Sequence, residues 1–270
     1  MCHVIGLSFF IIFLFNSIEQ VEGSIHDYKN EYFIPQSNAF FFHGGSEGLY
    51  ASKVSDQSSS SDKGYKGRSF IRFESITFTR TKESAEKQNE WQQYTGLVEA
   101  IIVEVKDRER IGGTYLKTDA ICCNQTLANE GHCKVGEVIM QTNPGNRGWP
   151  KRIKIFFEGK NEKATKSESV DIEKTGMYYL YFMYCDPTLK GTTISGRTVW
   201  KNPDGYLPGK MTPLMKFYGF MSLAYLLLGL GWLLRFVRFW KDIIQLHYHI
   251  TAVIALGMLE MALWFLTIRI

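Results

Sequence analysis

The sequence lacks the short motifs that carry most enzymatic chemistry. Across its 270 residues we find no glycine-rich phosphate-binding loop, no His-Glu-x-x-His metal motif and no nucleophile elbow. The glycine pairs at residues 44–45 and 112–113 are interpreted as turns. The sequence therefore predicts a protein that is not an enzyme and that carries no cofactor.

A second absence concerns nucleic acid and metal ions. The formal net charge is only +4, and the basic residues are scattered along the chain instead of forming a stripe interleaved with aromatic residues. His247 and His249 lie two residues apart at the start of an apolar segment, so they point to different faces of a helix and fit the membrane interface better than a chelating pair. We therefore expect no nucleic-acid partner and no metal site.

The N-terminus carries an apolar run that is too short to cross a bilayer as a helix. This run covers residues 4–15, has no Lys or Arg before it, and is followed by polar residues. Val21 and Gly23 then occupy the −3 and −1 positions of a cleavage site. We predict a signal peptide over residues 1–23, cleaved after Gly23; an uncleaved anchor is the alternative.

Residues 24–200 show the pattern of a β-rich domain, in which short apolar or alternating segments are separated by Gly, Ser and charged residues. Between residues 152 and 155 isoleucines alternate with basic residues, as a strand with one buried face requires. We expect an all-β antiparallel sandwich. Its predicted elements are strands at residues 39–42, 70–79, 97–105, 135–140, 152–157 and 177–184, a helix near 82–93, and loops at 52–67 and 159–169.

Cysteine is scarce, and its distribution is informative. Cys2 leaves with the leader, so Cys122, Cys123, Cys133 and Cys185 remain. An even number in an oxidising compartment predicts two disulfides, for which three pairings are possible. Adjacent cysteines rarely bond each other, so we expect Cys122 and Cys123 to pair separately, one of them with Cys185. Metal binding is the alternative, but no His or Cys lies at zinc-like spacing.

The segment directly after the cysteine pair carries an N-glycosylation sequon, Asn124-Gln125-Thr126. Its position beside two cysteines suits an exposed loop of a lumenal domain. We therefore predict a glycan on Asn124.

The last part of the sequence is apolar. Residues 217–234 contain no charged residue and, at about 1.5 Å per residue in a helix, approach the thickness of the hydrocarbon layer. Residues 243–266 contain one, Glu260, and neither segment shows a polar stripe at the helical period. We predict a transmembrane helix at residues 213–234, a basic aromatic turn at residues 235–242, and a second transmembrane helix at 243–266.

The leader decides the orientation of these helices. It places the β domain in the lumen, so the turn is expected to be cytosolic. The positive-inside rule agrees only in part, because Lys210 and Lys216 flank the lumenal side of the first helix. Trp200, Tyr206 and Trp240 fit aromatic anchors at the membrane surface, and membrane lipid is the expected partner of this part of the chain.

Glu260 is an intramembrane acid and invites two interpretations. A carboxylate at the centre of a membrane helix costs about 2.5–3.5 kcal/mol on insertion scales, so it usually faces other helices and marks a pathway or a polar network. Alternatively, it makes a packing hydrogen bond with a neighbouring helix or lies near the lumenal interface.

Residues 201–212 link the two halves and contain a motif with strong turn chemistry. We interpret this membrane-entry motif as a collar that docks the sandwich onto the membrane, with contact to a lumenal ligand as the alternative. Its residues are Asn202, Pro203, Gly205, Tyr206, Leu207, Pro208 and Gly209.

Several stretches together resemble a known family. They are residues 198–209, the Gly-Leu-Gly-Trp stretch at 229–232, the Phe-Trp-Lys-Asp stretch at 239–242, and residues 254–264. With the Cys122, Cys123 and Cys133 cluster and the strand before Cys185, they resemble the lung seven-transmembrane receptor family, also called Golgi-dynamics-domain seven-transmembrane proteins. The resemblance is to the transmembrane protein 87 branch, plant members in particular, and is specific over residues 198–266.

The resemblance implies a Golgi-dynamics-like β-sandwich in the lumen, followed by seven helices, in the Golgi membrane. It implies a part in membrane trafficking, such as retrograde endosome-to-Golgi transport or the handling of a lumenal cargo or ligand. A receptor-like or cation-conducting role is the alternative. The sequence contains two of the seven helices, and residues 267–270 do not resemble the family's continuation, so we expect a truncated form without pore or receptor activity.

Overall fold

The computed structural model describes residues 24–52, 67–87, 96–203, 205–239 and 244–269. The predicted signal peptide, most of the serine-rich loop at 52–67, the second half of the helix expected near 82–93, and Trp240 lie outside the described residues. The described part divides into two compact units, one ending at Pro208 and the other beginning at Gly209.

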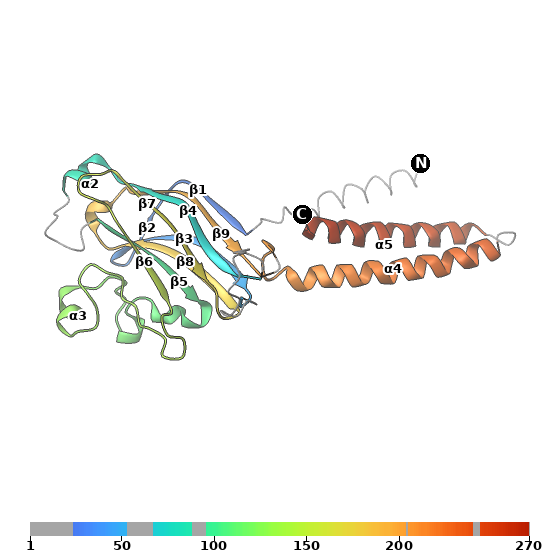
Figure 1. The fold of residues 1–270 in the computed structure, drawn as a ribbon, viewed down its shortest axis with the longest axis horizontal. Helices are drawn as coiled ribbons and strands as arrows, with labels where there is room; N and C mark the ends of the chain where they lie inside the picture. Colours follow the sequence, from blue (N-terminus) through green and yellow to red (C-terminus); the bar gives the residue numbers. More distant parts are fainter. Residues whose placement is uncertain (1–23, 53–66, 88–95, 204, 240–243, 270) are drawn as a thin grey trace, which may run out of the picture. The chain divides into compact units, whose positions relative to one another are not determined.

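The first unit is a sandwich of two antiparallel sheets (Figure 1). The four-stranded sheet has the order β1 (Ile25–Tyr32), β9 (Thr193–Lys201), β4 (Phe70–Thr79), β7 (Lys163–Asp171). The five-stranded sheet has the order β2 (Ile34–Gln36), β3 (Ala39–Leu49), β8 (Gly176–Tyr184), β5 (Leu97–Glu104), β6 (Lys151–Phe156). The predicted all-β sandwich is confirmed.

The central strand β8 shows why its sequence is apolar on both faces. Leu180 and Phe182 point toward the four-stranded sheet and are fully buried in the main core. Tyr181 and Met183 point the other way, yet they are also buried, in a second apolar cluster on the outer face of the same sheet. Something therefore covers that outer face, and it is the segment between β5 and β6.

Short helices decorate the connections of the sandwich. They are α2 (Lys82–Glu86), η1 (Val105–Arg110), η2 (Thr114–Leu116), α3 (Gln125–Asn129) and η3 (Pro187–Leu189). Thr81 caps α2, because its side-chain oxygen accepts a hydrogen bond from the Ser84 N–H at 3.2 Å.

Two expected elements are wrong. Residues 135–140 do not form a strand: Val138 and Met140 make only isolated bridges, to Cys122 and Ile111. The loop expected at residues 159–169 ends early, because β7 begins at Lys163. β7 is an edge strand with mostly exposed side chains, so it lacks the apolar alternation that marks a strand in a sequence.

The glycine pair at residues 44–45 is also misinterpreted as a turn. Both glycines lie inside β3, where the register with β8 shifts between His43 and Gly45. A Cβ atom on Gly44 would lie 2.7 Å from the Phe182 ring, so the strand passes too close to the core for any side chain. Contrary to the expectation that the motif is absent, residues 44–48 have the Gly-x-Ser-x-Gly spacing of a nucleophile elbow. An elbow requires a strand-to-helix turn, however, and this segment continues as a paired strand.

The second unit contains two helices, α4 (Thr212–Arg238) and α5 (Gln245–Arg269), which pack along each other. Both are long and apolar enough to cross a membrane. α4 extends through Arg235 and Arg238, which the sequence pattern assigned to the turn. Basic side chains in a last helical turn interact favourably with the negative end of the helix dipole.

Candidate functional site

The segment of residues 105–150 forms a cap over the outer face of the five-stranded sheet and is drawn in green to yellow-green in Figure 1. It has no β-strand of its own among the described residues and consists of η1, η2, α3 and irregular turns. Its apolar side chains pack on those of β5 and β8. The cap contributes Ile111, Ile121, Val138 and Met140, and the strands contribute Ile101, Val103, Tyr181 and Met183.

Two disulfides hold the cap. Cys122 bonds Cys185, which directly follows β8, with a Cα–Cα distance of 5.6 Å. Cys123 bonds Cys133 inside the cap, with a Cα–Cα distance of 5.9 Å. The structure thus bears out the expectations that the adjacent cysteines pair separately and that one of them pairs with Cys185. The first bond ties the cap to the sheet, and the second closes a small loop around α3.

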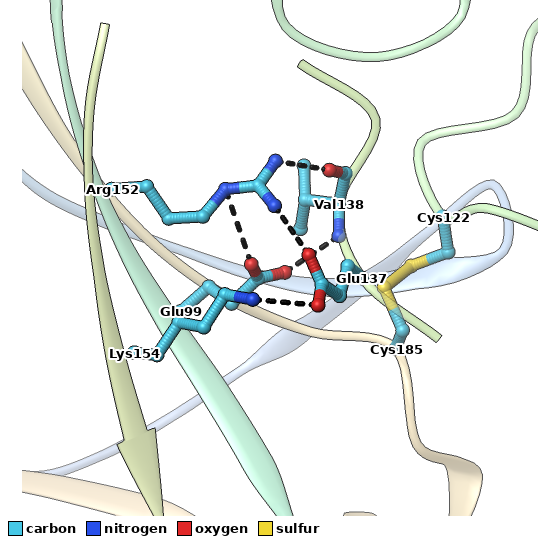
Figure 2. Close-up of polar contacts among 7 residues, drawn as sticks. All are labelled: Glu99, Cys122, Glu137, Val138, Arg152, Lys154 and Cys185. Atoms are coloured by element: carbon cyan, nitrogen blue, oxygen red, sulfur yellow. Dashed lines mark hydrogen bonds and ion pairs between the residues drawn. A yellow bond between two sulfur atoms is a disulfide. The ribbon is translucent and has the colours of Figure 1, made fainter. Parts of the chain in front are cut away.

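A buried carboxylate lies between the cap and the sheet (Figure 2). Glu99 on β5 is only 1% exposed. Its Oε2 accepts a hydrogen bond from the Val138 N–H at 2.5 Å, and its Oε1 lies 3.3 Å from Arg152 Nε without hydrogen-bond geometry. Burial raises the pKa of the Glu99 carboxyl above its ordinary value, although Arg152 and the Val138 N–H act in the opposite direction.

The same arginine connects Glu99 to a second carboxylate (Figure 2). Arg152 on β6 donates through Nη1 to Glu137 at 2.7 Å and through Nη2 to the Val138 carbonyl at 2.5 Å. Lys154, two residues further along the strand, donates to the other oxygen of Glu137 at 2.6 Å. Two carboxylates and two cations therefore form a neutral network that fastens cap residues 137–138 to β5 and β6. This network is named the Glu99 cluster below.

A second polar fastening lies at the start of the cap. Asp107 on η1 is buried and accepts hydrogen bonds from Arg110 Nε at 2.8 Å and from Asn143 Nδ2 at 2.8 and 2.9 Å. Because Asn143 lies near the end of the cap, Asp107 joins its two ends. Asp107 and Glu137 thus help to fix the shape of the cap.

The cysteines and the buried carboxylates around the cap are engaged with other residues. The four cysteines of the sandwich are all bonded, and the carboxylates of the Glu99 cluster are paired. Within the described ranges, no group of three His, Cys, Asp or Glu side chains could hold a metal ion. Two disulfides fix the cap covalently, and Asn124 is exposed on it.

The collar folds back onto the sandwich through Asn202, which is 2% exposed. Its side chain accepts a hydrogen bond from the Tyr50 N–H at 2.8 Å and donates to the Leu207 carbonyl at 2.9 Å, and its backbone pairs with Gly205. Gly205 has φ +140°, a conformation that other residues rarely adopt. Up to Pro208 the motif is thus part of the sandwich unit, with Tyr206 half exposed and Pro203 and Pro208 buried; Gly209 opens the second unit.

The helical unit places Glu260 at the edge of the α4–α5 contact. Glu260 lies three residues after Gly257 and four before Trp264, and both of these contact α4: Trp264 stacks on Tyr218, and a Cβ on Gly257 would meet the Tyr225 ring. Glu260 is partly buried, and it makes no hydrogen bond or ion pair with any side chain that the structure describes.

The two histidines of α5 do not converge. His247 is partly buried, stacks on Trp232 of α4 with a ring-centroid distance of 5.9 Å, and lies beside the Ile244 N–H, while His249 is exposed. Trp232 also donates a hydrogen bond to Thr251 Oγ1 at 2.9 Å. These residues pack the hairpin and do not form a ligand pair.

Sequence reasoning missed the Glu99 cluster. The one available signal is Glu99 itself, which interrupts the apolar run of residues 97–103. Such an acid is easily interpreted as the solvent-facing residue of a half-buried strand, and the basic residues of β6 invite the same interpretation. The cap that buries them has no periodic pattern of its own.

Taken together, these features define a membrane protein with a disulfide-bonded β-sandwich that is followed by two transmembrane helices. Residues 213–270 match the family model described as GOST, seven transmembrane domain.

The chain is also similar to transmembrane proteins 87A and 87B. It is 46% identical over 63 residues to transmembrane protein 87B of Mus musculus, a match that covers 23% of this chain and 11% of that protein. It is 42% identical over 65 residues to transmembrane protein 87A of Xenopus tropicalis and 40% identical over 65 residues to the Homo sapiens protein 87A, in each case 24% of this chain and 12% of the relative. The resemblance to the lung seven-transmembrane receptor family is confirmed on this segment, which spans about a tenth of the relatives' length.

Proposed function

We propose that the protein resides in the Golgi membrane with its sandwich in the lumen, and that it acts without catalysis in membrane trafficking. The proposed role is retrograde endosome-to-Golgi transport or the handling of a lumenal cargo. One observation carries this proposal: a sandwich stapled by two disulfides directly precedes helices that match the GOST seven-transmembrane domain. Disulfides persist in the secretory pathway and are rare in the cytosol.

The cap supports a binding role for the lumenal domain. A rigid surface loses little conformational freedom when a partner binds, so a disulfide-fixed cap is suited to recognition. The proposed partners are a lumenal cargo or ligand for the sandwich and membrane lipid for the exposed apolar side chains of α4 and α5, such as Phe220 and Val253.

Localisation and sorting test the proposal. We expect a C-terminally tagged chain to colocalise with Golgi markers and to resist extraction by alkaline carbonate. Loss of the protein should alter the sorting of glycoproteins that recycle through the Golgi. A carbonate-extractable, cytosolic product would overturn the membrane and lumenal assignment, whereas normal sorting in its absence would overturn only the trafficking role.

A receptor-like or cation-conducting role is a second candidate, because Glu260 is held at the edge of a helix–helix contact with no described partner. An unpaired intramembrane acid commonly belongs to an ion or proton pathway. Reconstituted protein that carries all seven helices of the family should then conduct a cation current that Glu260→Gln abolishes and Glu260→Asp retains. Equal currents in the wild type and in Glu260→Gln would leave the acid with a packing role.

A further inference from the structure

The glycosylation sequon lies inside the smaller disulfide loop. Asn124 directly follows Cys123, and α3 occupies the middle of the loop that the Cys123–Cys133 bond closes, a sequence separation of 10 residues. Cys123 is buried, its N–H donates to the Glu137 carbonyl at 2.9 Å, and its carbonyl accepts from the Gly136 N–H at 3.1 Å. One side of the sequon is therefore anchored rigidly.

The sequon residues themselves are wound into a helical turn. The Asn124 side-chain oxygen accepts a hydrogen bond from the Leu127 N–H at 2.9 Å, so Asn124 is the N-cap of α3. Its backbone carbonyl accepts from the Ala128 N–H at 3.1 Å, and Gln125 Nε2 donates to Asn129 at 2.9 Å. Asn124 is exposed, but its carboxamide is held by the helix that it caps.

Glycan transfer requires the Asn124 carboxamide to be oriented for attack on the sugar, and its role as N-cap of α3 fixes it in another orientation. In the reaction, Asn124 Nδ2 bonds to the anomeric carbon of a lipid-linked oligosaccharide. The bond from that carbon to the lipid diphosphate breaks, the diphosphate leaves with the bonding electron pair, and the proton that Nδ2 loses passes to a base of the transferase. An amide nitrogen is a weak nucleophile because its lone pair is delocalised into the carbonyl group. The carboxamide must therefore be reoriented in the transferase, together with the hydroxyl of Thr126. Because the Asn124 side-chain oxygen accepts from the Leu127 N–H of α3, reorienting it breaks the cap of this helix and favours its unwinding.

Whether α3 unwinds depends on the disulfide. A helix of five residues is not stable by itself, because nucleation costs more than one turn of hydrogen bonds returns. In an open chain the sequon is thus available. Closing the loop removes most of the open conformations and fixes the helix between two anchored ends.

We propose that Asn124 accepts a glycan only while the Cys123–Cys133 loop is open. Once this disulfide has formed, the sequon no longer acts as a glycan acceptor. Closure is a thiol–disulfide exchange, in which Cys123 and Cys133 are oxidised while the disulfide of an oxidised exchange protein is reduced to its dithiol. Glycan occupancy is therefore set by a competition between two lumenal reactions at neighbouring residues. This inference rests on the proposed lumenal location of the sandwich.

The test uses the full chain, made without glycans in cells whose oligosaccharyltransferase is inhibited, and purified in detergent. Purified transferase and lipid-linked oligosaccharide are added, and the initial rate of transfer to Asn124 is measured by mass spectrometry. We expect Cys123→Ser/Cys133→Ser to accept glycan about tenfold faster or more than the oxidised wild type, since closing a loop of this size shifts its opening equilibrium by at least that factor. Equal rates would overturn the proposal.

The second disulfide provides a matched control. Cys122→Ser/Cys185→Ser removes the bond of sequence separation 63 but leaves the small loop closed. Its transfer rate should stay near that of the oxidised wild type, and an increase as large as that of the first variant would show that general loosening sets the rate, against the proposal. For Cys123→Ser/Cys133→Ser, only molecules that retain the Cys122–Cys185 bond by mass spectrometry are counted, so that unfolded protein does not contribute.

The outcomes separate this inference from the proposed function. Rapid glycosylation of the fully oxidised wild type would overturn the ordering of the two reactions and leave the lumenal location untouched. If no variant accepts a glycan, even after complete reduction and unfolding, the sequon is not a substrate and the predicted modification of Asn124 falls with the inference. Asn124→Gln defines the background in each case.

Discussion

The two faces of the five-stranded sheet are buried in different ways. On the inner face, Phe182 lies within ring-contact distance of Phe73, Phe78 and Tyr28 from the opposite sheet, at centroid separations of 5.7 to 6.0 Å. On the outer face, the cap covers a smaller apolar cluster, and beside that cluster it buries Glu99 and most of Arg152 and is joined to the sheet by a disulfide. One layer is a regular sheet, and the other is irregular chain.

An irregular layer such as the cap needs more than apolar contact to stay fixed on a sheet. A sheet brings alternate side chains to one face automatically, so its apolar area suffices to hold it. The cap has no such periodicity, and the structure adds two covalent bonds and a neutral ionic network where apolar contact is limited. Small disulfide-rich domains use the same means when their cores are too small.

The largest effect should come from the inner face. Phe182→Ala should lower the free energy of unfolding by about 3–5 kcal/mol, because it removes a fully buried ring and leaves a cavity between the sheets. Denaturant unfolding of the full chain in detergent, followed by near-ultraviolet circular dichroism, measures this change. Phe156→Ala, at a ring that is 48% exposed, is the control and should cost about 0.5 kcal/mol or less. Similar costs for the two variants would contradict the assigned core.

The next effect should come from the covalent fastening of the cap. Cys122→Ser/Cys185→Ser should cost about 2–5 kcal/mol, since the bond closes a long loop in the unfolded chain. Hydrogen exchange should accelerate in cap residues 105–121 and 134–150, while the loop that the Cys123–Cys133 bond closes and the backbone amides of β8 that bond β3 stay protected. Uniform loss of protection in both sheets would show that the cap and the core form one cooperative unit, and the contrast between the faces would not hold.

The inner face was largely predictable from the sequence, whereas the outer face was not. The run at residues 177–184 is apolar on both sides and predicts a central strand, which β8 is. The number and adjacency of the cysteines reduced the set of possible disulfide pairings, because two cysteines adjacent in sequence rarely have the geometry to bond each other. The position of Glu99 under the cap depends on contacts between residues almost forty positions apart, as in its bond to Val138, and no local pattern encodes those contacts.

The sequence patterns missed β1, β2 and β9, whereas β4 lies at its predicted bounds. Polar residues and register shifts explain why β1 and β9 show no clear alternation. β1 pairs with β9 through a register shift between Lys29 and Glu31, and β4 pairs with β9 through a shift between Glu74 and Thr77. A shift of one residue moves the following side chains to the other face, so a period of two is lost in the sequence although the ladder continues. Membrane helices are easier to predict from a sequence than such strands, because length and apolarity alone identify them.

The buried carboxylate of Glu99 should make the free energy of unfolding depend on pH. The folded protein binds the proton of Glu99 more tightly than the unfolded chain does, because burial raises the pKa of this carboxyl. The contribution of Glu99 to the free energy of unfolding is therefore greatest below the ordinary glutamate pKa of 4.5 and falls as pH rises through the raised folded pKa. Glu99→Gln cannot ionise, so its unfolding free energy should fall less over that range.

Urea unfolding at a series of pH values measures the slope of the free energy of unfolding against pH. Glu109→Gln, at an exposed carboxylate of η1, is the control for loss of one negative charge and should keep the wild-type slope. A slope that is unchanged in Glu99→Gln would mean that Arg152 and the Val138 N–H fully offset the burial of the carboxylate.

The smallest effect should come from the outer arm of the Glu99 cluster. Lys154 is about one-third exposed and contacts only Glu137 in this network, so Lys154→Gln should cost about 0.2–1 kcal/mol, and less at high salt. Arg152→Gln should cost more and show little salt dependence, because Arg152 is largely buried and also holds Glu99 and the Val138 carbonyl. Denaturant unfolding at low and high salt compares the two variants. If Lys154→Gln cost as much as Arg152→Gln at both salt concentrations, the cap would be held by the net charge of β6 and not by the buried carboxylate beneath it.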